Sequence, residues 1–271
     1  MCNPPQARGT RSAPKVSGKK VTISKKISHT KIPHGKVISW NARTLSMHRT
    51  DPSGRARRNR ALATISRLLT LCDILCLQET RLGANDKISL KTHYNDKYII
   101  YYENDILGHG GALTMVSRKF ARDYHIEQIL LGDAAKGRIL PLVFQPKSNL
   151  SPPPPLTPLP SLCVVNVYLT SGATPAVRHR EFEALGRLDP ASKIILCGDF
   201  NFVEVPSDAP SPTSNIIIKN DTYDKWCDLV EKLNLKEVFQ PTHTCYSITK
   251  SLHKCPLITQ ATITFNYAVW H

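Results

Sequence analysis

Acidic residues are scarce in this sequence of 271 residues, which has 21 Asp and Glu against 36 Lys and Arg. The formal net charge at pH 7 is therefore +15, and no Asp or Glu follows Glu237. A chain this basic is poorly suited to a cationic partner. Its charge favours a polyanion such as DNA, or RNA, and the alternative is an anionic membrane surface.

Long apolar runs are also missing, because none approaches the roughly 20 residues that a membrane-spanning helix needs. The N-terminus has no apolar stretch of the kind found in a secretory signal. None of the eight cysteines forms a Cys-x-x-Cys pair, and four of them lie in apolar runs: Cys72, Cys76, Cys163 and Cys197. We therefore expect buried reduced thiols in preference to zinc ligands or disulfides, and an intracellular protein without membrane or disulfide-linked partners.

The first 36 residues contain nine Lys or Arg and no acidic residue, mixed with Pro, Ser, Gly and Thr. Such a stretch cannot bury enough apolar surface to fold alone, so we expect residues 1–35 to form a disordered basic arm. The arm is interpreted either as functional, through non-specific phosphate contact or a nuclear-import signal, or as a solvated tail, and the sequence favours neither interpretation. We expect the nucleus to be the protein's compartment.

After the arm, short β-branched runs alternate with helical patterns, which predicts an α/β fold. The strands are predicted at Lys36–Trp40, Asp73–Leu77, Tyr98–Tyr102, Gly111–Val116, Arg138–Phe144, Leu162–Tyr168 and Ile194–Cys197. Helices are predicted between the first two strands, over about Val177–Leu188, and around Trp226–Leu233. A proline-rich loop at residues 147–161 interrupts this order, and we interpret it as a passive spacer in preference to an SH3-type ligand.

Polar side chains follow several of these strands at the point where each strand ends. Asn41 follows the first, Gln78-Glu79 the second, and Gly198-Asp199-Phe200-Asn201 the last, while Tyr168 ends the strand that begins at Leu162. The carboxyl ends of strands in α/β folds converge on one edge. Carboxylate and amide oxygens gathered there are the ligands that a hard cation such as Mg²⁺ requires, so we expect a cation site at this edge.

In their order, these motifs resemble those of the endonuclease/exonuclease/phosphatase superfamily. The set comprises Ser39-Trp40-Asn41, Leu77-Gln78-Glu79-Thr80, Gly110-Gly111-Ala112, Asn166-Val167-Tyr168 and Gly198-Asp199-Phe200-Asn201. The variant Cys-Gly-Asp-Phe-Asn-Phe-Val, with Pro241-Thr242-His243-Thr244 further on, is most similar to the endonuclease domains of LINE-type non-LTR retrotransposons. The resemblance covers a domain at residues 36–250 and leaves 251–271 as an aberrant tail.

The resemblance implies a four-layer αββα sandwich, incomplete at its C-terminus, with a Mg²⁺- or Mn²⁺-dependent phosphodiesterase activity. It implies that Asn41 and Glu79 hold the metal and that Tyr168 contacts the scissile phosphate. By the same comparison, Asp199 orients or deprotonates the attacking water, and Asn201 supports the transition state. The metal would neutralise phosphate charge while the carboxylate aims the water in line.

An arginine-rich segment lies between the first motif and the first predicted helix, and it lacks acidic partners over most of its length. We predict that it binds the nucleic-acid backbone, and the alternative is a solvated helix face. Its members are Arg43, Arg49, Arg55, Arg57, Arg58 and Arg60.

Two late motifs of the superfamily, an Arg-Ile-Asp-like strand and a terminal Ser-Asp-His, are absent from these residues. No Asp–His pair can form after Glu237, and the sequence changes character after Lys250. We hypothesise a truncation or frameshift there, with weakened folding and little nuclease activity unless the tail covers the open sheet edge. Three functions stay open: a DNA-nicking phosphodiesterase, a catalytically dead nucleic-acid-binding remnant, and a phosphatase acting on a small or lipid phosphate.

Overall fold

The computed structural model describes residues 35–43, 45, 52–103, 110–147, 161–201, 221–236 and 261–264. Residues 1–34 of the predicted arm lie outside these ranges. So do residues 148–160 of the predicted proline-rich loop and all of the predicted tail except 261–264. In this part of the chain no helix is long and apolar enough to cross a membrane.

The first sheet has five strands in the order β3-β4-β2-β1-β9. Its strands are β1 (Lys36–Asn41), β2 (Ile74–Gln78), β3 (Tyr98–Glu103), β4 (Ala112–Ser117) and β9 (Ala261–Thr264). Strands β1 and β2 are parallel and pair Asn41 with Gln78, whereas β4 runs antiparallel to β2 and β3. The parallel pairing brings the carboxyl ends of β1 and β2 together.

The second sheet has four strands in the order β5-β6-β7-β8. Its strands are β5 (Tyr124–Gln128), β6 (Ile139–Pro146), β7 (Leu162–Tyr168) and β8 (Lys193–Asp199). Strands β7 and β8 are parallel, and Tyr168 lies opposite Asp199 in their register. This sheet therefore also has two carboxyl ends side by side.

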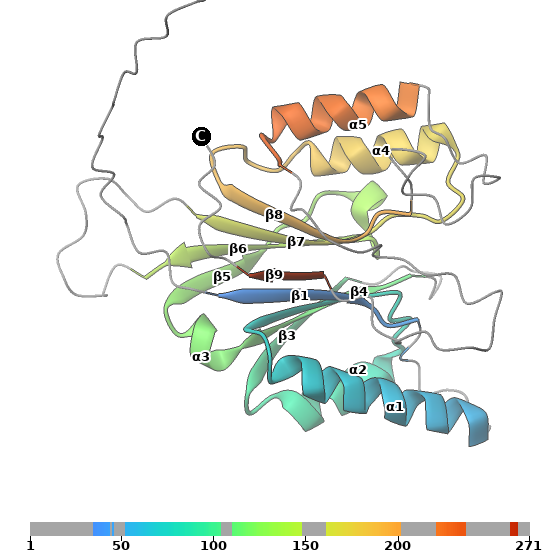
Figure 1. The fold of residues 1–271 in the computed structure, drawn as a ribbon, viewed down its shortest axis with the longest axis vertical. Coiled ribbons are helices and arrows are strands. Elements are labelled where there is room, and N and C mark those ends of the chain that lie inside the picture. The colour runs from blue at the N-terminus through green and yellow to red at the C-terminus, as the bar shows by residue number, and fades with distance from the viewer. Residues whose placement is uncertain are drawn as a thin grey trace, which may run out of the picture. The chain divides into compact units, whose positions relative to one another are not determined.

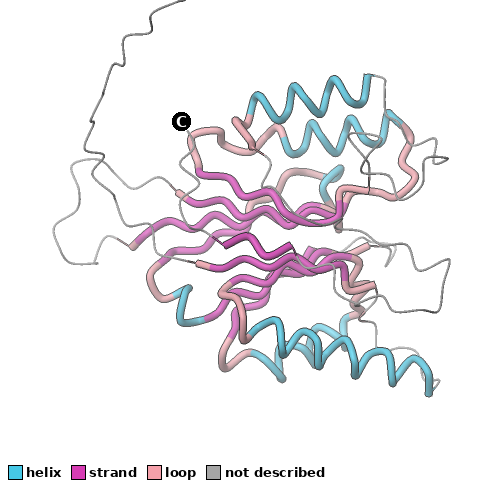
Figure 2. Tube along the Cα trace, viewed as in Figure 1, coloured by secondary structure: helices cyan, strands magenta, loops and turns pink. Residues whose placement is uncertain are grey.

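The helices are α1 (Pro52–Leu69), α2 (Ala84–Tyr94), α3 (Arg118–Ala121), α4 (Pro175–Leu185) and α5 (Asp221–Lys232), with a 3₁₀ turn at Asp133–Ala135. The longer helices lie on the outer faces of the two sheets, whereas the short α3 lies beside the sandwich, in the connection from β4 to β5 (Figures 1 and 2). Helices α1 and α2 pack on the first sheet, and α4 and α5 pack on the second. The result is the αββα sandwich that the motif resemblance implies.

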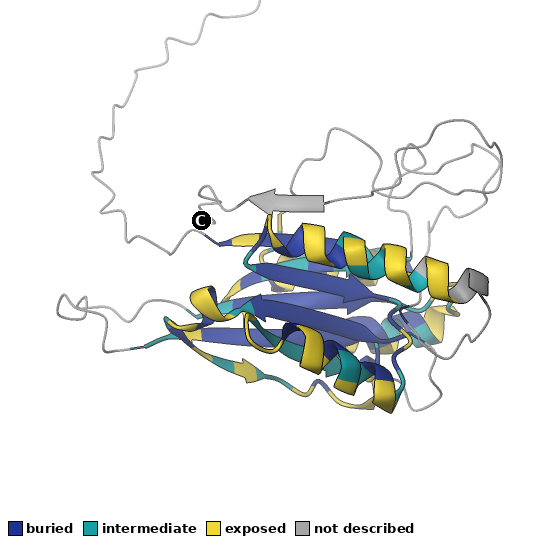
Figure 3. Cartoon of the chain, turned by 90° about the horizontal axis from the view of Figure 1, so that it is seen from below, coloured by how far each residue is buried: buried dark blue, intermediate teal, exposed yellow. Residues whose placement is uncertain are grey.

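Apolar side chains from both sheets meet in the middle of the sandwich. This inner layer includes Ile74 and Val116 of the first sheet and Leu140, Phe144 and Val164 of the second. Strand β2 is buried along its whole length because α1 covers one face and the second sheet covers the other. The dark blue strands of Figure 3 show this burial, which is typical of a sheet that is covered on both faces.

One polar residue crosses this apolar layer and ties the sheets together. Asn166 of β7 is fully buried, and its amide nitrogen lies 3.1 Å from the carbonyl of Leu77 and 2.9 Å from that of Leu113. Its amide oxygen accepts a hydrogen bond of 2.7 Å from Gln78 Nε2, which also bonds Ser39 Oγ at 3.0 Å. A buried polar group costs free energy unless it is hydrogen-bonded, and here every side-chain hydrogen bond of Asn166 crosses between the sheets. The network therefore fixes the position of β7 over β2.

Strand β9 comes from the segment that the sequence marked as an aberrant tail. Its backbone pairs antiparallel with β1, with Lys36 opposite Thr264 and Ser39 opposite Ala261. It therefore covers the edge of β1 that would otherwise expose unpaired backbone groups. We expected an open sheet edge unless the tail covered it, and in this structure four residues of the tail segment lie at the edge of β1.

The four cysteines in apolar runs are free thiols in the structure, and their burial was predicted from the apolar runs around them. Burial raises the pKa of Cys72 to about 12 and that of Cys163 to about 12, against an ordinary value of 9.0. The folded state therefore holds each thiol proton more tightly than the unfolded state does. The contribution of each thiol to the free energy of unfolding is complete below pH 9 and is lost as the pH rises towards 12.

Alkaline pH should therefore lower the free energy of unfolding through these thiols. Above pH 9 the unfolded chain has released each thiol proton while the folded chain retains it, so each thiol contributes a slope of about −1.4 kcal/mol per pH unit. Denaturant titrations between pH 9 and 11 under reducing conditions should show a shallower slope for Cys163→Ala than for the wild type. Equal slopes would contradict the prediction, and the difference between the two proteins at pH 8 provides the baseline.

Candidate active site

The ends of the two parallel strand pairs meet at one end of the sandwich. Asn41, the last residue of β1, donates a hydrogen bond of 2.7 Å from Nδ2 to Oδ2 of Asp199, the last residue of β8. This bond joins the two sheets directly. Two motifs 158 residues apart in the sequence are thus brought into contact, as the convergence of strand ends predicts.

Asp199 also organises the turn that follows β8. Its Oδ1 accepts a hydrogen bond of 3.1 Å from the backbone nitrogen of Asn201, and its backbone oxygen accepts one of 2.9 Å from Leu169. The side chain of Asn201 donates to the carbonyl oxygen of Leu169 at 2.7 Å. Asp199 and Asn201 are consequently held against the end of β7, where Tyr168 lies.

Glu79 follows β2 and is paired with an arginine that the sequence reading missed. Arg81 Nη2 lies 2.6 Å from Glu79 Oε1, and the Glu79 side chain is 20% exposed. The Gly-Gly motif supports this segment, since the carbonyl oxygen of Gly111 accepts from Thr80 and that of Gly110 accepts from Arg81. Arg81 could have been suspected from sequence, because a cation two residues from a candidate metal-binding carboxylate is an electrostatic partner for it.

Tyr168 lies in the electrostatic field of the two carboxylates. Burial raises the pKa of its hydroxyl above the usual value of 10.0, and the negative charges of Glu79 and Asp199 raise the pKa further, against lowering by Arg138 and Arg81. The guanidinium of Arg138 lies over the Tyr168 ring, 5.0 Å from its centroid. A phenol with a raised pKa keeps its proton at neutral pH, so Tyr168 can donate a hydrogen bond to a phosphate oxygen.

Strained backbone is concentrated at this end of the sheets. Among the described residues, five that are not glycine have a positive φ, and four of them closely follow β1, β2 or β8: Arg43 (47°), Glu79 (54°), Arg81 (48°) and Asn201 (50°). Left-handed conformations cost side-chain-bearing residues about 1–2 kcal/mol each and persist only where surrounding contacts impose them. Strain of this kind is typical of a site whose side chains must take fixed directions.

Beneath Asn201 lies a buried ion pair that the sequence reading also missed. Arg178 and Glu181 of α4 are 4% and 2% exposed, and Arg178 Nη1 lies 2.9 Å from Glu181 Oε2. Arg178 Nη2 donates to the carbonyl oxygens of Thr170 at 2.8 Å and of Asn201 at 3.3 Å. The backbone nitrogen and hydroxyl of Thr170 donate to Glu181 Oε1 at 2.9 Å and 2.6 Å. The pair thereby connects the turns that follow β7 and β8.

The arginine-rich segment is placed only in part. Arg43 follows β1, and its backbone nitrogen donates to Asn41 Oδ1 at 3.0 Å. Arg55 and Arg60 are exposed on the first half of α1, and Arg58 there is partly buried. Helix α1 begins after the end of β1 and runs back towards the start of β2, so its first half lies on the side of the sandwich where β1 ends. Arg49 and the side chain of Arg57 lie outside the described residues.

The oxygen atoms at the site suit a hard divalent cation. Asn41 ends β1, and Glu79 directly follows β2, whose last residue Gln78 pairs with Asn41. No group of three or more His, Cys, Asp or Glu side chains in the described residues could form a full protein cage for a metal. Two protein oxygens with remaining water ligands are a common arrangement for Mg²⁺, which sheds water reluctantly. Carboxylate and amide oxygens are the ligand type that hard divalent cations take, whereas zinc more often takes nitrogen and sulfur.

A family model identifies the class of this protein. The chain belongs to the Endonuclease/Exonuclease/phosphatase family, whose model matches residues 38–245. The match extends over both parallel strand pairs and all five polar residues of the site. Among curated proteins, none matches the chain.

Several solved structures are similar in fold. The catalytic domain of Xenopus laevis APE2 has 19% sequence identity and a TM-score of 0.48, over 71% of this chain and 67% of that one. The endonuclease domain of TRAS1, a telomere-specific non-LTR retrotransposon, has 12% identity and a TM-score of 0.44, over 74% and 73%. Truncated Caenorhabditis elegans TDP2 has 19% identity and a TM-score of 0.39, over 63% of each chain.

Proposed function

We propose that this chain is a divalent-metal-dependent phosphodiesterase that nicks DNA, of the retrotransposon endonuclease type. The observation that carries the proposal is the hydrogen bond between Asn41 and Asp199. This bond joins Asn41 of the first sheet, which we propose as a metal ligand, to Asp199 of the second, which we propose as the water-activating carboxylate. The retrotransposon assignment is supported by the motif Cys-Gly-Asp-Phe-Asn-Phe-Val at residues 197–203, and the DNA substrate by the net charge of +15.

The residues of the site have complementary tasks in such a reaction. Asn41 and Glu79 would hold the cation, which when bound supplies positive charge to the phosphate oxygens. Asp199 keeps lone pairs beyond its two hydrogen bonds, so it can accept a proton from a water in line with the scissile bond. Tyr168 donates from its neutral hydroxyl to the phosphate, and Asn201 has a second amide hydrogen for the charge that develops there.

A second candidate function rests on the composition of residues 238–271. The Asp–His pair implied by the resemblance cannot come from the residues after Glu237, because they include no Asp or Glu. Residues that act as a unit lose most of their effect when one is missing. The second candidate function is therefore a nucleic-acid-binding protein with little or no turnover, in which the basic residues still contact phosphates.

Nicking of supercoiled plasmid at low salt tests the proposal. The wild type should nick in Mg²⁺ and lose this activity in EDTA, and Glu79→Gln or Asp199→Asn should lower the rate by at least about 100-fold. Glu127→Gln is the matched control, because it removes one exposed carboxylate from β5 and should leave the rate unchanged.

Three outcomes of this experiment differ in meaning. Metal-dependent nicking that is lost only in the site variants supports the phosphodiesterase. Nicking that persists in EDTA, or that both site variants retain, would overturn it. Folded wild-type protein that retards DNA without nicking it would establish the second candidate function.

A further inference from the structure

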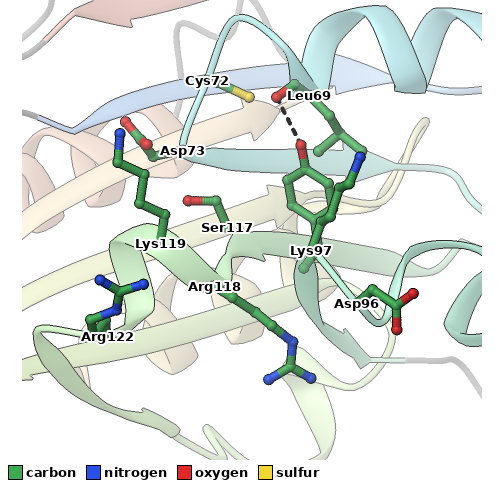
Figure 4. Close-up of a pocket in the computed structure, with 10 residues that line it drawn as sticks. Leu69, Cys72, Asp73, Asp96, Lys97, Ser117, Arg118, Lys119 and Arg122 are labelled. Carbon is green, nitrogen blue, oxygen red and sulfur yellow. Dashed lines mark hydrogen bonds between the residues drawn. The ribbon is translucent and has the colours of Figure 1, made fainter.

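A shallow basic groove lies at the far end of the first sheet from the candidate active site. Its volume is about 410 Å³, and its charged lining consists of Lys97, Arg118, Lys119, Arg122, Asp73 and Asp96. Figure 4 shows these side chains arriving from three places: the loop before β2, the turn before β3, and helix α3. We call this feature the rear groove.

Backbone contacts define the position of the rear groove. The nitrogen of Asp73 donates to the carbonyl of Lys36, where β1 begins, and the nitrogen of Ser117 donates to the carbonyl of Asp73, where β4 ends. Asp73 precedes β2, whereas Glu79 follows it, so the two ends are separated by the length of that strand. Six residues at about 3.3 Å each place them roughly 20 Å apart. The cations of the rear groove therefore cannot contact the phosphate that reacts at the site.

The charge of the rear groove is predominantly positive. Four cationic side chains face two carboxylates, and the Asp73 carboxylate already accepts a hydrogen bond of 3.0 Å from the backbone nitrogen of Lys36. All four cations are exposed, and within the described ranges none of Lys97, Lys119 and Arg122 forms an ion pair. Cations without acidic partners are available to an anionic ligand.

The framework of the groove is held by hydrogen bonds that fix part of this charge in place. Arg118 donates from Nε to the carbonyl oxygen of Asn95 at 2.7 Å and from Nη2 to its side-chain oxygen at 3.2 Å. The backbone nitrogen of Arg118 donates to the carbonyl of Lys97 at 2.8 Å, and Lys147 Nζ donates to that of Arg122 at 2.8 Å. Because these elements are already fixed, an anion that binds there orders few new groups.

We infer that the rear groove binds the phosphate backbone of a nucleic acid, at a segment separate from the one that reaches the site. The inference uses the nucleic-acid partner of the proposed function but not its catalysis. Exposed cations spread over three elements suit phosphates spaced along a strand, whereas one small anion would be met by a compact and buried set of donors. A strand bound at both ends of the first sheet would be held on the protein over a greater length than the site alone provides.

The test compares two triple variants of the full chain with equal loss of charge. One is Lys97→Ala/Lys119→Ala/Arg122→Ala in the rear groove. The control is Arg180→Ala/Lys225→Ala/Lys232→Ala, which removes three exposed cations from α4 and α5. Arg118 is kept because its bonds to Asn95 hold the framework. Far-ultraviolet circular dichroism and thermal unfolding should show that both variants remain folded, since surface substitutions change stability little.

Binding is measured by fluorescence anisotropy with a single-stranded and a duplex 40-mer over a series of salt concentrations. The rear-groove variant should bind at least about tenfold more weakly than the control variant. A plot of log Kd against log salt concentration should also have a slope smaller by about 2 for the rear-groove variant than for the control variant. This is the difference expected when two or three phosphate contacts are lost. Equal affinities and equal salt slopes for the two triple variants would overturn the inference.

Two further arms distinguish phosphate-backbone binding from a general polyanion effect and from an effect on catalysis. Poly-glutamate is used as a polyanion without phosphate. If the rear-groove substitutions weakened binding of poly-glutamate as strongly as binding of the nucleic acids, the assignment to a phosphate backbone would be wrong. The rear-groove variant should also nick a plasmid at saturating protein as the wild type does. If neither the wild type nor the variants nick the plasmid, the proposed function is wrong, and the binding measurements still test the rear groove independently.

Discussion

Gly198→Ala should cost more than about 4 kcal/mol in the free energy of unfolding, or prevent folding altogether. Gly198 precedes Asp199 in β8 and has a φ of 148°, a conformation that L residues rarely adopt. A Cβ at this position would overlap the carbonyl oxygen of Val167 and lie 2.7 Å from its carbonyl carbon. Because these are backbone atoms of the paired strand β7, only a separation of β7 from β8 could relieve the clash.

Gly172→Ala is the matched control for this substitution. Gly172 also has a positive φ, 63°, but a Cβ there would meet no atom within 4 Å. It should therefore cost only the conformational penalty of about 1–2 kcal/mol. Chemical denaturation of both variants measures the difference, and similar losses for the two would show that strand contact at Gly198 is unimportant. A folded Gly198→Ala protein should also have lost the position of Asp199, and with it any metal-dependent nicking.

Arg178→Met should lower the free energy of unfolding by about 3–5 kcal/mol, because it leaves the Glu181 carboxylate buried without its cation. Burial lowers the pKa of Arg178, while the charges of Glu181 and Asp199 raise it. The same change removes the donor to the carbonyl oxygens of Thr170 and Asn201. The turn that carries Asn201 should consequently loosen at the site.

A double-mutant cycle separates the ion pair from general loss of packing. Arg178→Met/Glu181→Leu should be considerably less destabilising than the sum of the two single changes, since the double variant buries no unpaired charge. Additive losses, measured by denaturant unfolding, would show that the two side chains do not interact. Arg180→Met, on the exposed face of the same helix, should change stability by less than about 0.5 kcal/mol.

Most of the fold could be predicted because its strands are buried on one or both faces. All seven predicted strands exist, within two residues at either end, and the three predicted helices exist as α1, α4 and α5. Strand β5 was missed because His125 and Glu127 alternate with its apolar residues on an exposed face, and only Tyr124 is fully buried. Helix α2 was missed because it buries few side chains: Asp86, Leu90 and Tyr94. Its buried aspartate caps the helix by accepting from the nitrogen of Gly83 at 2.9 Å.

The sequence by itself determined which polar residues end the strands and that they form an ordered family set. Strand ends, carboxylates and amides can be recognised locally, and parallel strands bring their ends to the same edge. Asn41, Glu79, Tyr168, Asp199 and Asn201 could all be named on these grounds, and their individual roles stay predictions.

Only the tertiary structure decided what surrounds those residues. The support of Asn201 by Arg178 and the inter-sheet bonds of Asn166 both depend on how separate elements pack. The rear groove likewise exists only because three segments meet where β2 begins. The local pattern of a chain predicts which face of an element is buried. The partner of a polar side chain depends instead on three-dimensional distances between segments that are far apart in the sequence, and no local pattern gives these distances.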